Sequence, residues 1–135
     1  MFVKTLNIST KNQFEIIDIS QEINNFLNIL KIDIGVVNVF SKHSTSAISI
    51  NENEKGLLKD LEIFLNEFIL ENNNYFHDKI DDNAHSHLKS FFLKNSETIP
   101  ISNNQMNLGI WQSVFFIEFD GPRSSREIIL TVFGK

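Results

Sequence analysis

The stretch SVFFIEFDGPRSSREIILTVFG, residues 113–134, holds two runs of β-branched and aromatic residues separated by a turn signal. Val, Ile, Phe and Thr favour extended backbone, so residues 113–119 and 126–134 are predicted strands. The Asp-Gly-Pro sequence between them demands a turn, because proline has a fixed φ and no backbone N–H. Together with MNLG at 106–109, we expect these strands to close the fold as an antiparallel meander.

Strands and helices are mixed in the rest of the chain. The remaining predicted strands cover residues 2–8, 14–19, 35–41, 46–51 and 97–102, and the predicted helices cover residues 21–31, 55–71 and about 84–93. Ser20 is placed to cap the first helix. The second helix has apolar residues at the spacing of one helical face, so it must lie against a sheet. The polar segment STKNQ, residues 9–13, suits a hairpin between the first two strands.

The order of these elements indicates an α+β protein. Strands interrupted by two or three helices, with the closing strands together, fit two layers in which a mixed, mainly antiparallel sheet packs against the helices. A length of 135 residues with 41% hydrophobic residues fits a single domain, 1–135. The aromatic-rich strands carry more apolar surface than one small sheet needs, so we expect part of it to be buried between subunits of a homo-oligomer.

Composition narrows the partners and the chemistry. Twelve basic against seventeen acidic residues give a formal charge of -5, which argues against nucleic acid or an anionic membrane surface as a partner. The sequence has no apolar run long enough to span a bilayer and no signal-peptide pattern, so we expect a cytoplasmic protein. It has no cysteine, so any metal ligand must be His, Asp, Glu or a backbone oxygen.

The four histidines are candidates for a metal site, because catalytic zinc takes three protein ligands, often imidazoles. His85 and His87 are rivals, since residues two apart on a helix point roughly 200° apart. His87 shares a helical face with Phe91 and is therefore expected to face inward. His77 in the preceding loop and His43 at a strand end can converge on the start of that helix. Spacing alone leaves open that all four are ordinary surface residues.

Hydroxyl groups form a second candidate site. Ser44, Thr45 and Ser46 lie at the break between two predicted strands, where hydroxyl and free N–H groups can bind phosphate oxygens. An ordinary Ser/Thr-rich turn explains the same pattern. Glu52, at the end of the second of these strands, can serve as a ligand, as a general base or as a residue at a helix start.

The Asp-Gly-Pro turn and the single tryptophan complete the candidates. Arg123 follows the proline and presents a planar charge suited to phosphate, although pairing with Asp120 or Glu118 explains it equally well. Glu118 interrupts an apolar strand and needs a cation or a donor there. Trp111 and Gln112 can form the wall of a pocket for a flat heterocycle, and core packing of the indole is the alternative.

Taken together, these segments resemble the YjbQ family, whose members are described as secondary thiamine phosphate synthases. The resemblance is carried, in order and at the same spacing, by HSTSAISINEN (43–53), YFH (75–77), DDNAHSHLKS (81–90), IPI (99–101), LGIWQ (108–112) and EFDGPRSSR (118–126). It implies a small α+β protein that assembles as a homotrimer, with a histidine-lined metal site near the subunit boundaries.

Site residues follow from the resemblance position by position. It implies His43, His77 and His87 as metal ligands and Glu52 and Arg123 as catalytic residues. Together with the candidates described above, we expect the contacts of a phosphorylated small-molecule substrate to be Ser44, Thr45, Ser46, Asn83, Trp111, Gln112 and Arg123. Zinc is the expected divalent cofactor, with magnesium as an alternative suited to a diphosphate.

The activity implied by the resemblance joins a pyrimidine-methyl diphosphate to a thiazole phosphate with release of pyrophosphate. The cation and Arg123 would stabilise the departing pyrophosphate, and Trp111 would orient the rings. Two alternatives are a metal- or phosphate-binding protein whose synthase activity is incidental, and a metal-assisted hydrolase in which Glu52 acts as base.

Overall fold

The computed structural model describes residues 1–135, and its elements follow the predicted order. The strands are β1 (Phe2–Thr10), β2 (Glu15–Asp18), β3 (Ile34–Ser41), β4 (Ser46–Glu52), β5 (Ser96–Ser102), β6 (Gln105–Met106), β7 (Gln112–Glu118) and β8 (Arg123–Gly134). The helices are α1 (Ser20–Leu30), α2 (Lys55–Phe68) and α3 (Ala84–Leu93), with a 3₁₀ turn, η1 (Phe76–Lys79), before α3. No helix combines the length and the apolar character needed to cross a bilayer.

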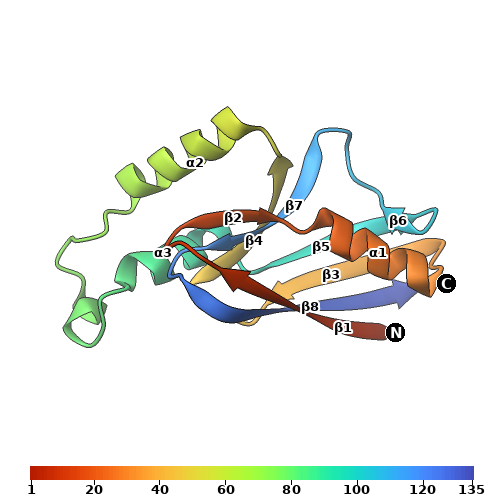
Figure 1. Ribbon diagram of the computed structural model, residues 1–135, viewed down its shortest axis with the longest axis horizontal. Coiled ribbons are helices and arrows are strands. Elements are labelled where there is room, and N and C mark those ends of the chain that lie inside the picture. Colours follow the sequence, from red (N-terminus) through yellow and green to blue (C-terminus); the bar gives the residue numbers. More distant parts are fainter.

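The strands form two antiparallel sheets. The larger sheet has the order β1-β8-β3-β5-β6, and the smaller has the order β2-β7-β4 (Figure 1). Every strand pair in both sheets is antiparallel. The predicted α+β class with three helices is therefore confirmed, and the single predicted sheet is divided into two.

Two of the predicted strand pairings are wrong. β7 pairs with β2 and β4 whereas β8 pairs with β1 and β3, so the closing strands do not form a meander. β1 and β2 also lie in different sheets and do not form a hairpin. The Asp-Gly-Pro turn instead carries the chain from one sheet to the other. Gly121 is required there, because an added Cβ would lie 2.1 Å from the carbonyl oxygen of Asn12.

β7 contributes to both hydrophobic cores of the molecule. Val114 and Phe116 point into the larger core, which fills the space between the two sheets and is covered by α1. The intervening Phe115 and Ile117 point to the other face and pack with Leu65 of α2. Because side chains alternate along a strand, a strand buried on both faces reads as a continuous apolar run, as β7 does.

A buried ion pair joins the two sheets at the end of β7. Glu118 is 0% exposed and Arg126, on β8, is 5% exposed. The Arg126 Nε donates to Glu118 Oε1 at 2.8 Å, and one Nη of the same guanidinium donates to Glu118 Oε2 and, at 2.9 Å, to Thr45 Oγ1. Thr10 Oγ1 donates to Glu118 Oε1 at 2.8 Å. The carboxylate that interrupts the apolar strand thus has the cation and the donor that its burial requires.

We predict that Arg126→Met lowers the free energy of unfolding by roughly 3–5 kcal/mol, because it leaves the Glu118 carboxylate buried without a counterion. Unfolding in guanidinium chloride, at the same protein concentration for every variant, measures the loss of free energy. Arg123→Met is the matched control: its guanidinium belongs to a half-exposed ion pair, so we expect a loss of less than about 1 kcal/mol. The double variant Glu118→Gln/Arg126→Met should recover part of the stability. Equal losses for the two single variants would contradict this role of the pair.

Candidate functional site

Two histidines meet where η1 joins α3. The ring centroids of His77, on η1, and His87, on α3, are 4.8 Å apart, and the ring planes cross at 79°. Asp78 ties the two elements together, since its Oδ1 accepts the backbone N–H of Ala84 at 3.0 Å in the first turn of α3. Both histidines therefore belong to one short segment, residues 75–87, and the structure of this segment sets their relative position.

Asn83 and Asp120 select the tautomer of the neutral His77 ring. Asn83 Nδ2 donates to Asp120 Oδ2 at 2.8 Å. An ionised carboxylate can only accept hydrogen bonds, so the amide nitrogen must be the atom that faces Asp120. The amide oxygen of Asn83 therefore faces His77, whose Nε2 lies 3.1 Å away. The proton of the neutral ring must then be on Nε2, which leaves the lone pair on Nδ1. A carboxylate, an amide and an imidazole are in this way linked in series.

Arg123 belongs to the same group through Asp120. Its Nε donates to the backbone oxygen of Asp120 at 2.9 Å, and one Nη donates to Asp120 Oδ2 at 2.8 Å. The alternative in which Arg123 pairs with Asp120 therefore holds, and Glu118 is paired with Arg126 instead. The Arg123 side chain remains 49% exposed, so part of its guanidinium can still meet a ligand.

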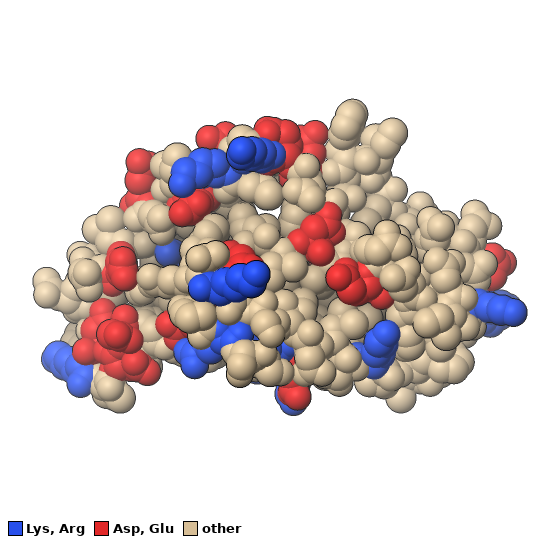
Figure 2. Space-filling view, viewed as in Figure 1, with Lys and Arg blue, Asp and Glu red and all other residues tan.

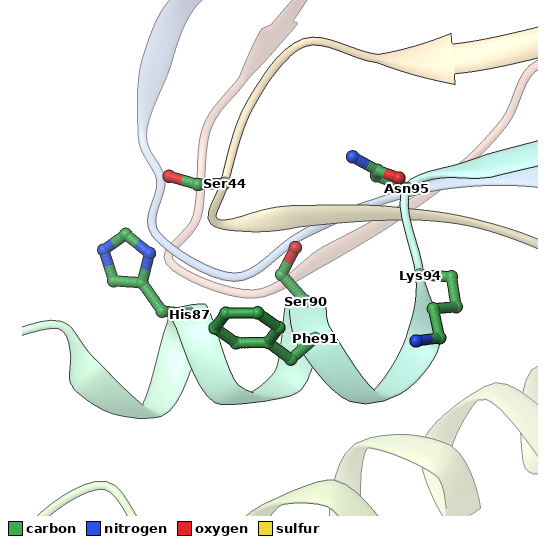
Figure 3. A pocket seen from close by; sticks show the side chains of 6 residues that line it. All are labelled: Ser44, His87, Ser90, Phe91, Lys94 and Asn95. Carbon is green, nitrogen blue, oxygen red and sulfur yellow. The ribbon is translucent and has the colours of Figure 1, made fainter.

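His87 also lines a polar pocket on the outer side of α3. The pocket has a volume of about 330 Å³ and is lined by Ser44, His87, Ser90, Phe91, Lys94 and Asn95. Figure 3 shows Ser44, on the β3–β4 connection, facing His87 across the pocket, with Phe91 between His87 and Lys94 along the helix. An imidazole and a hydroxyl thus face each other across the hollow, and Lys94 lines its far end beyond Phe91, a combination of groups that can contact a small anion.

His43 does not join the other two histidines. Its Nε2 accepts the backbone N–H of Glu127 at 2.8 Å, so the ring is neutral and this nitrogen is occupied. Burial, followed by the nearby Arg126 charge, lowers the pKa of His43 below its usual range. No group of three His, Asp or Glu side chains is placed to hold a metal ion. The residues of one chain therefore do not complete a three-ligand set, and the divalent cofactor stays a prediction.

Two of the predicted hydroxyl contacts serve the fold instead. Thr45 Oγ1 accepts from buried Arg126, and Ser46 Oγ lies 2.6 Å from Ser41 Oγ, with all four residues buried. Of the three predicted hydroxyls, Ser44 is the one that lines the pocket beside His87.

Three further predicted residues lie at the other end of β7. Glu52 and Gln112 are register partners in the β4–β7 pair, whereas Asp120 follows the opposite end of β7. Gln112 Oε1 accepts the backbone N–H of Gly109 at 2.8 Å and closes the loop before the strand. Trp111 in that loop is 69% exposed and packs in no core. The structure therefore separates Glu52, Trp111 and Gln112 from the histidine pair.

α3 turns a polar face inward, contrary to expectation. His85 is 3% exposed, whereas His87 is half-buried and Phe91 is 76% exposed. The reason lies in two serines of the buried face: Ser86 Oγ donates to the backbone oxygen of Phe119 at 2.7 Å, and Ser90 Oγ to that of Ser46 at 2.6 Å. These bonds hold α3 against the strand ends.

Sequence reasoning missed several residues of this region. The sequence indicates Asp120 only as a partner of Arg123, whereas in the structure it also accepts a hydrogen bond from Asn83. No sequence pattern points to Lys94 or Lys89 as a site residue. Burial lowers the pKa of the Lys89 ammonium and of the His85 imidazole. No local pattern marks a buried lysine, because its surroundings come from other elements.

Comparison with known proteins identifies the family. The family model for YjbQ, described as UPF0047 protein YjbQ-like, matches residues 4–135. The chain belongs to the YjbQ family. A UPF0047 protein of Methanothermobacter thermautotrophicus is 45% identical over 135 residues, which are 100% of this chain and 94% of the relative. The UPF0047 protein YjbQ of Escherichia coli O157:H7 is 28% identical over 136 residues, with 99% of each chain covered.

Two solved structures have the same fold as this chain. A YbjQ-like protein of unknown function from Sulfolobus solfataricus P2 superposes with a TM-score of 0.96 at 36% identity, covering 99% of this chain and 97% of the other. A hypothetical protein of Aeropyrum pernix K1 gives a TM-score of 0.95 at 29% identity over 100% of both chains.

The predicted activity does not stand. The resemblance implied a thiamine-phosphate synthase with a histidine-lined metal site, and the alternatives were a metal- or phosphate-binding protein and a metal-assisted hydrolase. The relatives bear family names without an activity, and one solved member is described as a protein of unknown function. One chain also gathers no metal-binding group. The assignment as a thiamine-phosphate synthase with a histidine-lined metal site is therefore wrong for this YjbQ-family protein.

We predict that the free energy of unfolding falls as the pH is lowered through and below 6.5, the ordinary pKa of histidine. Because the pKa of His43 is lower in the folded state, the unfolded chain takes up the proton first and is favoured at low pH. In His43→Gln the amide oxygen can still accept the Glu127 N–H but does not titrate, so the decrease between pH 7.5 and pH 5 should be smaller. Denaturant unfolding at both pH values measures this, and an unchanged decrease in the variant would refute it.

Proposed function

We propose that this YjbQ-family protein is an enzyme that uses His77 and His87 for acid–base chemistry on a small phosphorylated molecule. The observation that carries the proposal is the series Asp120–Asn83–His77, because it fixes the tautomer of an exposed imidazole. A surface histidine without a function has no need of such fixation, whereas a general base requires a defined lone pair.

The contacts around the histidine pair support separate roles for the two rings. His77 presents Nδ1 as an acceptor, so it suits the role of base. His87, at a centroid distance of 4.8 Å and bordering the polar pocket, is placed to supply a proton to a group bound there. Two imidazoles within one site can remove one proton and deliver another in the same turnover.

The choice of a phosphorylated substrate rests on the groups that face the pocket. Lys94 supplies an ammonium group, Ser44 supplies a hydroxyl and His87 supplies an imidazole. Arg123, half-exposed beside Asp120, can contact a second anionic group. Lys94 and Arg123 thus place cationic side chains beside the pocket in a chain with a formal charge of -5, which supports an anionic ligand at this place.

We predict that wild-type protein converts at least one member of a panel of sugar phosphates, nucleotides and phosphorylated heterocycles, followed by ³¹P NMR. His87→Ala should lower turnover by about 10² or more, the usual contribution of a general acid or base. Asn83→Ala should also lower it and shift its pH profile, because His77 loses the partner that fixes its tautomer. Lys31→Met, on the exposed end of α1, is the control and should leave turnover unchanged. Failure to convert any member of the panel would overturn the proposal.

We further propose that the working form is a homotrimer, in which the face around the histidine pair is covered by a neighbouring subunit. Large apolar side chains surround the pair while lying open to solvent: Phe76 is 85% exposed, Ile80 is 88% exposed and Phe91 is 76% exposed. A cluster of this kind indicates a surface that associates. Covering it would exclude water from the histidine pair and strengthen its electrostatic interactions. The cytoplasmic location stays a prediction.

Sedimentation equilibrium tests the assembly. We predict a mass three times the 15.6 kDa of one chain. Phe91→Glu should shift the protein towards monomer, because it places a carboxylate in the apolar interface. Ile29→Glu, at an exposed site on α1, should leave the mass unchanged. A monomeric wild-type protein at micromolar concentration would contradict the proposed trimer.

A further inference from the structure

A second cavity lies on the other side of α3, between that helix and α2. It has a volume of about 480 Å³, within the range of small-molecule sites, roughly 300–1,000 Å³. His85 and Lys89 reach it from α3, where they are one helical turn apart, and Asn66 and Glu62 reach it from α2. Figure 2 shows the surface hollowed beneath α2, with acidic side chains gathered along that helix. None of these residues takes part in the histidine pair.

The Lys89 ammonium is buried at the bottom of this cavity with few partners. Lys89 is 4% exposed, and its Nζ donates to Asn66 Oδ1 at 3.0 Å. Its ammonium makes no ion pair with a carboxylate within 4.0 Å. An ammonium group has three donors, and burying it costs free energy unless they are satisfied. A ligand that brings acceptor oxygens would supply the missing partners.

His85 has a similar deficit. Its Nδ1 is buried without a hydrogen-bond partner. Its Nε2 lies 3.9 Å from Glu71 Oε1, which is too far for a hydrogen bond. Buried polar atoms in folded proteins almost always have a partner, so an unpaired imidazole beside an under-paired ammonium indicates a polar group that enters from outside.

The mouth of the cavity carries the opposite charge. The side chains of Glu62 and Glu71 are 35% and 63% exposed, so both lie nearer to solvent than Lys89. Gln13 Nε2 donates to Glu71 Oε1 at 3.4 Å and holds this carboxylate at the rim. A simple anion would pass two carboxylates on its way to the ammonium. A molecule with an anionic end and a cationic end would instead complement both the buried ammonium and the carboxylates at the mouth.

We propose that this cavity binds a small zwitterion of the α-amino-acid class, with its carboxylate on Lys89 and His85 and its ammonium towards Glu71 and Glu62. The apolar part of the lining, made by Phe14 and Phe119 with ring centroids 6.0 Å apart, would contact the side chain of the ligand. The inference is independent of the proposed enzyme, because the two sites lie on different faces of α3.

Calorimetric titration of the full-length protein with glycine, L-alanine, L-serine, L-glutamine and L-phenylalanine, each separately, tests the site. We expect at least one of them to bind saturably. The corresponding amino-acid amide, which lacks the carboxylate, and the N-acetyl amino acid, which lacks the ammonium, should bind at least about tenfold more weakly, since each loses a charge-assisted contact. If none of the five binds, or if both derivatives bind as well as the parent, the proposal is overturned.

Variants locate the binding. Lys89→Met should reduce the affinity at least about tenfold, and Glu71→Gln should reduce it as well. The matched control Lys55→Met, an exposed lysine on α2, should bind like the wild type. Should Lys89→Met fail to fold, ¹H–¹⁵N shift changes in the wild-type protein decide: changes centred on residues 85, 89, 66 and 71 support the site, and changes centred on His87 refute it.

Discussion

The buried pair of Glu118 and Arg126 is the interaction on which the arrangement of this protein depends. It lies where β7 ends and where β8 has just begun, and these strands belong to different sheets. Thr10 from β1 and Thr45 from the β3–β4 connection complete its hydrogen bonds, so four separate segments meet at one carboxylate and one guanidinium. The Asp120 N–H also donates to Glu118 at 3.2 Å. The position of Asp120, and through Asn83 that of His77, is thus set by a pair that touches no ligand.

Local sequence patterns predicted the helices and strands of this fold, but they did not predict which strands pair with one another. The spacing of apolar residues in α2 and the β-branched runs of the strands follow from each segment by itself. Which strands pair is decided by where the chain crosses between sheets, and the Asp-Gly-Pro turn looks the same in a hairpin as in a crossover. The continuous run of Val114 to Ile117 did carry a sign of burial on both faces, because a strand with one exposed face alternates.

The candidate site was predictable only where local geometry decides the arrangement of its residues. The incompatibility of His85 and His87 follows from helix geometry and is reproduced, since they line different cavities. Which of them is buried could not be derived, because the serine bonds that orient α3 involve Phe119 and Ser46, far away in the chain. Glu52 and Trp111 lie apart from the histidines for a similar reason: strand register, which the sequence does not state, places them at the opposite end of β7.

The sharing of β7 between the two cores has a consequence for how the molecule comes apart. A layer that shared no strand with its neighbour could unfold locally and leave the rest of the protein folded. Here the outer cluster under α2 and the inner cluster between the sheets are opposite faces of one strand. Neither cluster can melt without exposing the backbone that supports the other, so cooperativity is built into the architecture, and the two layers behave as a single thermodynamic unit.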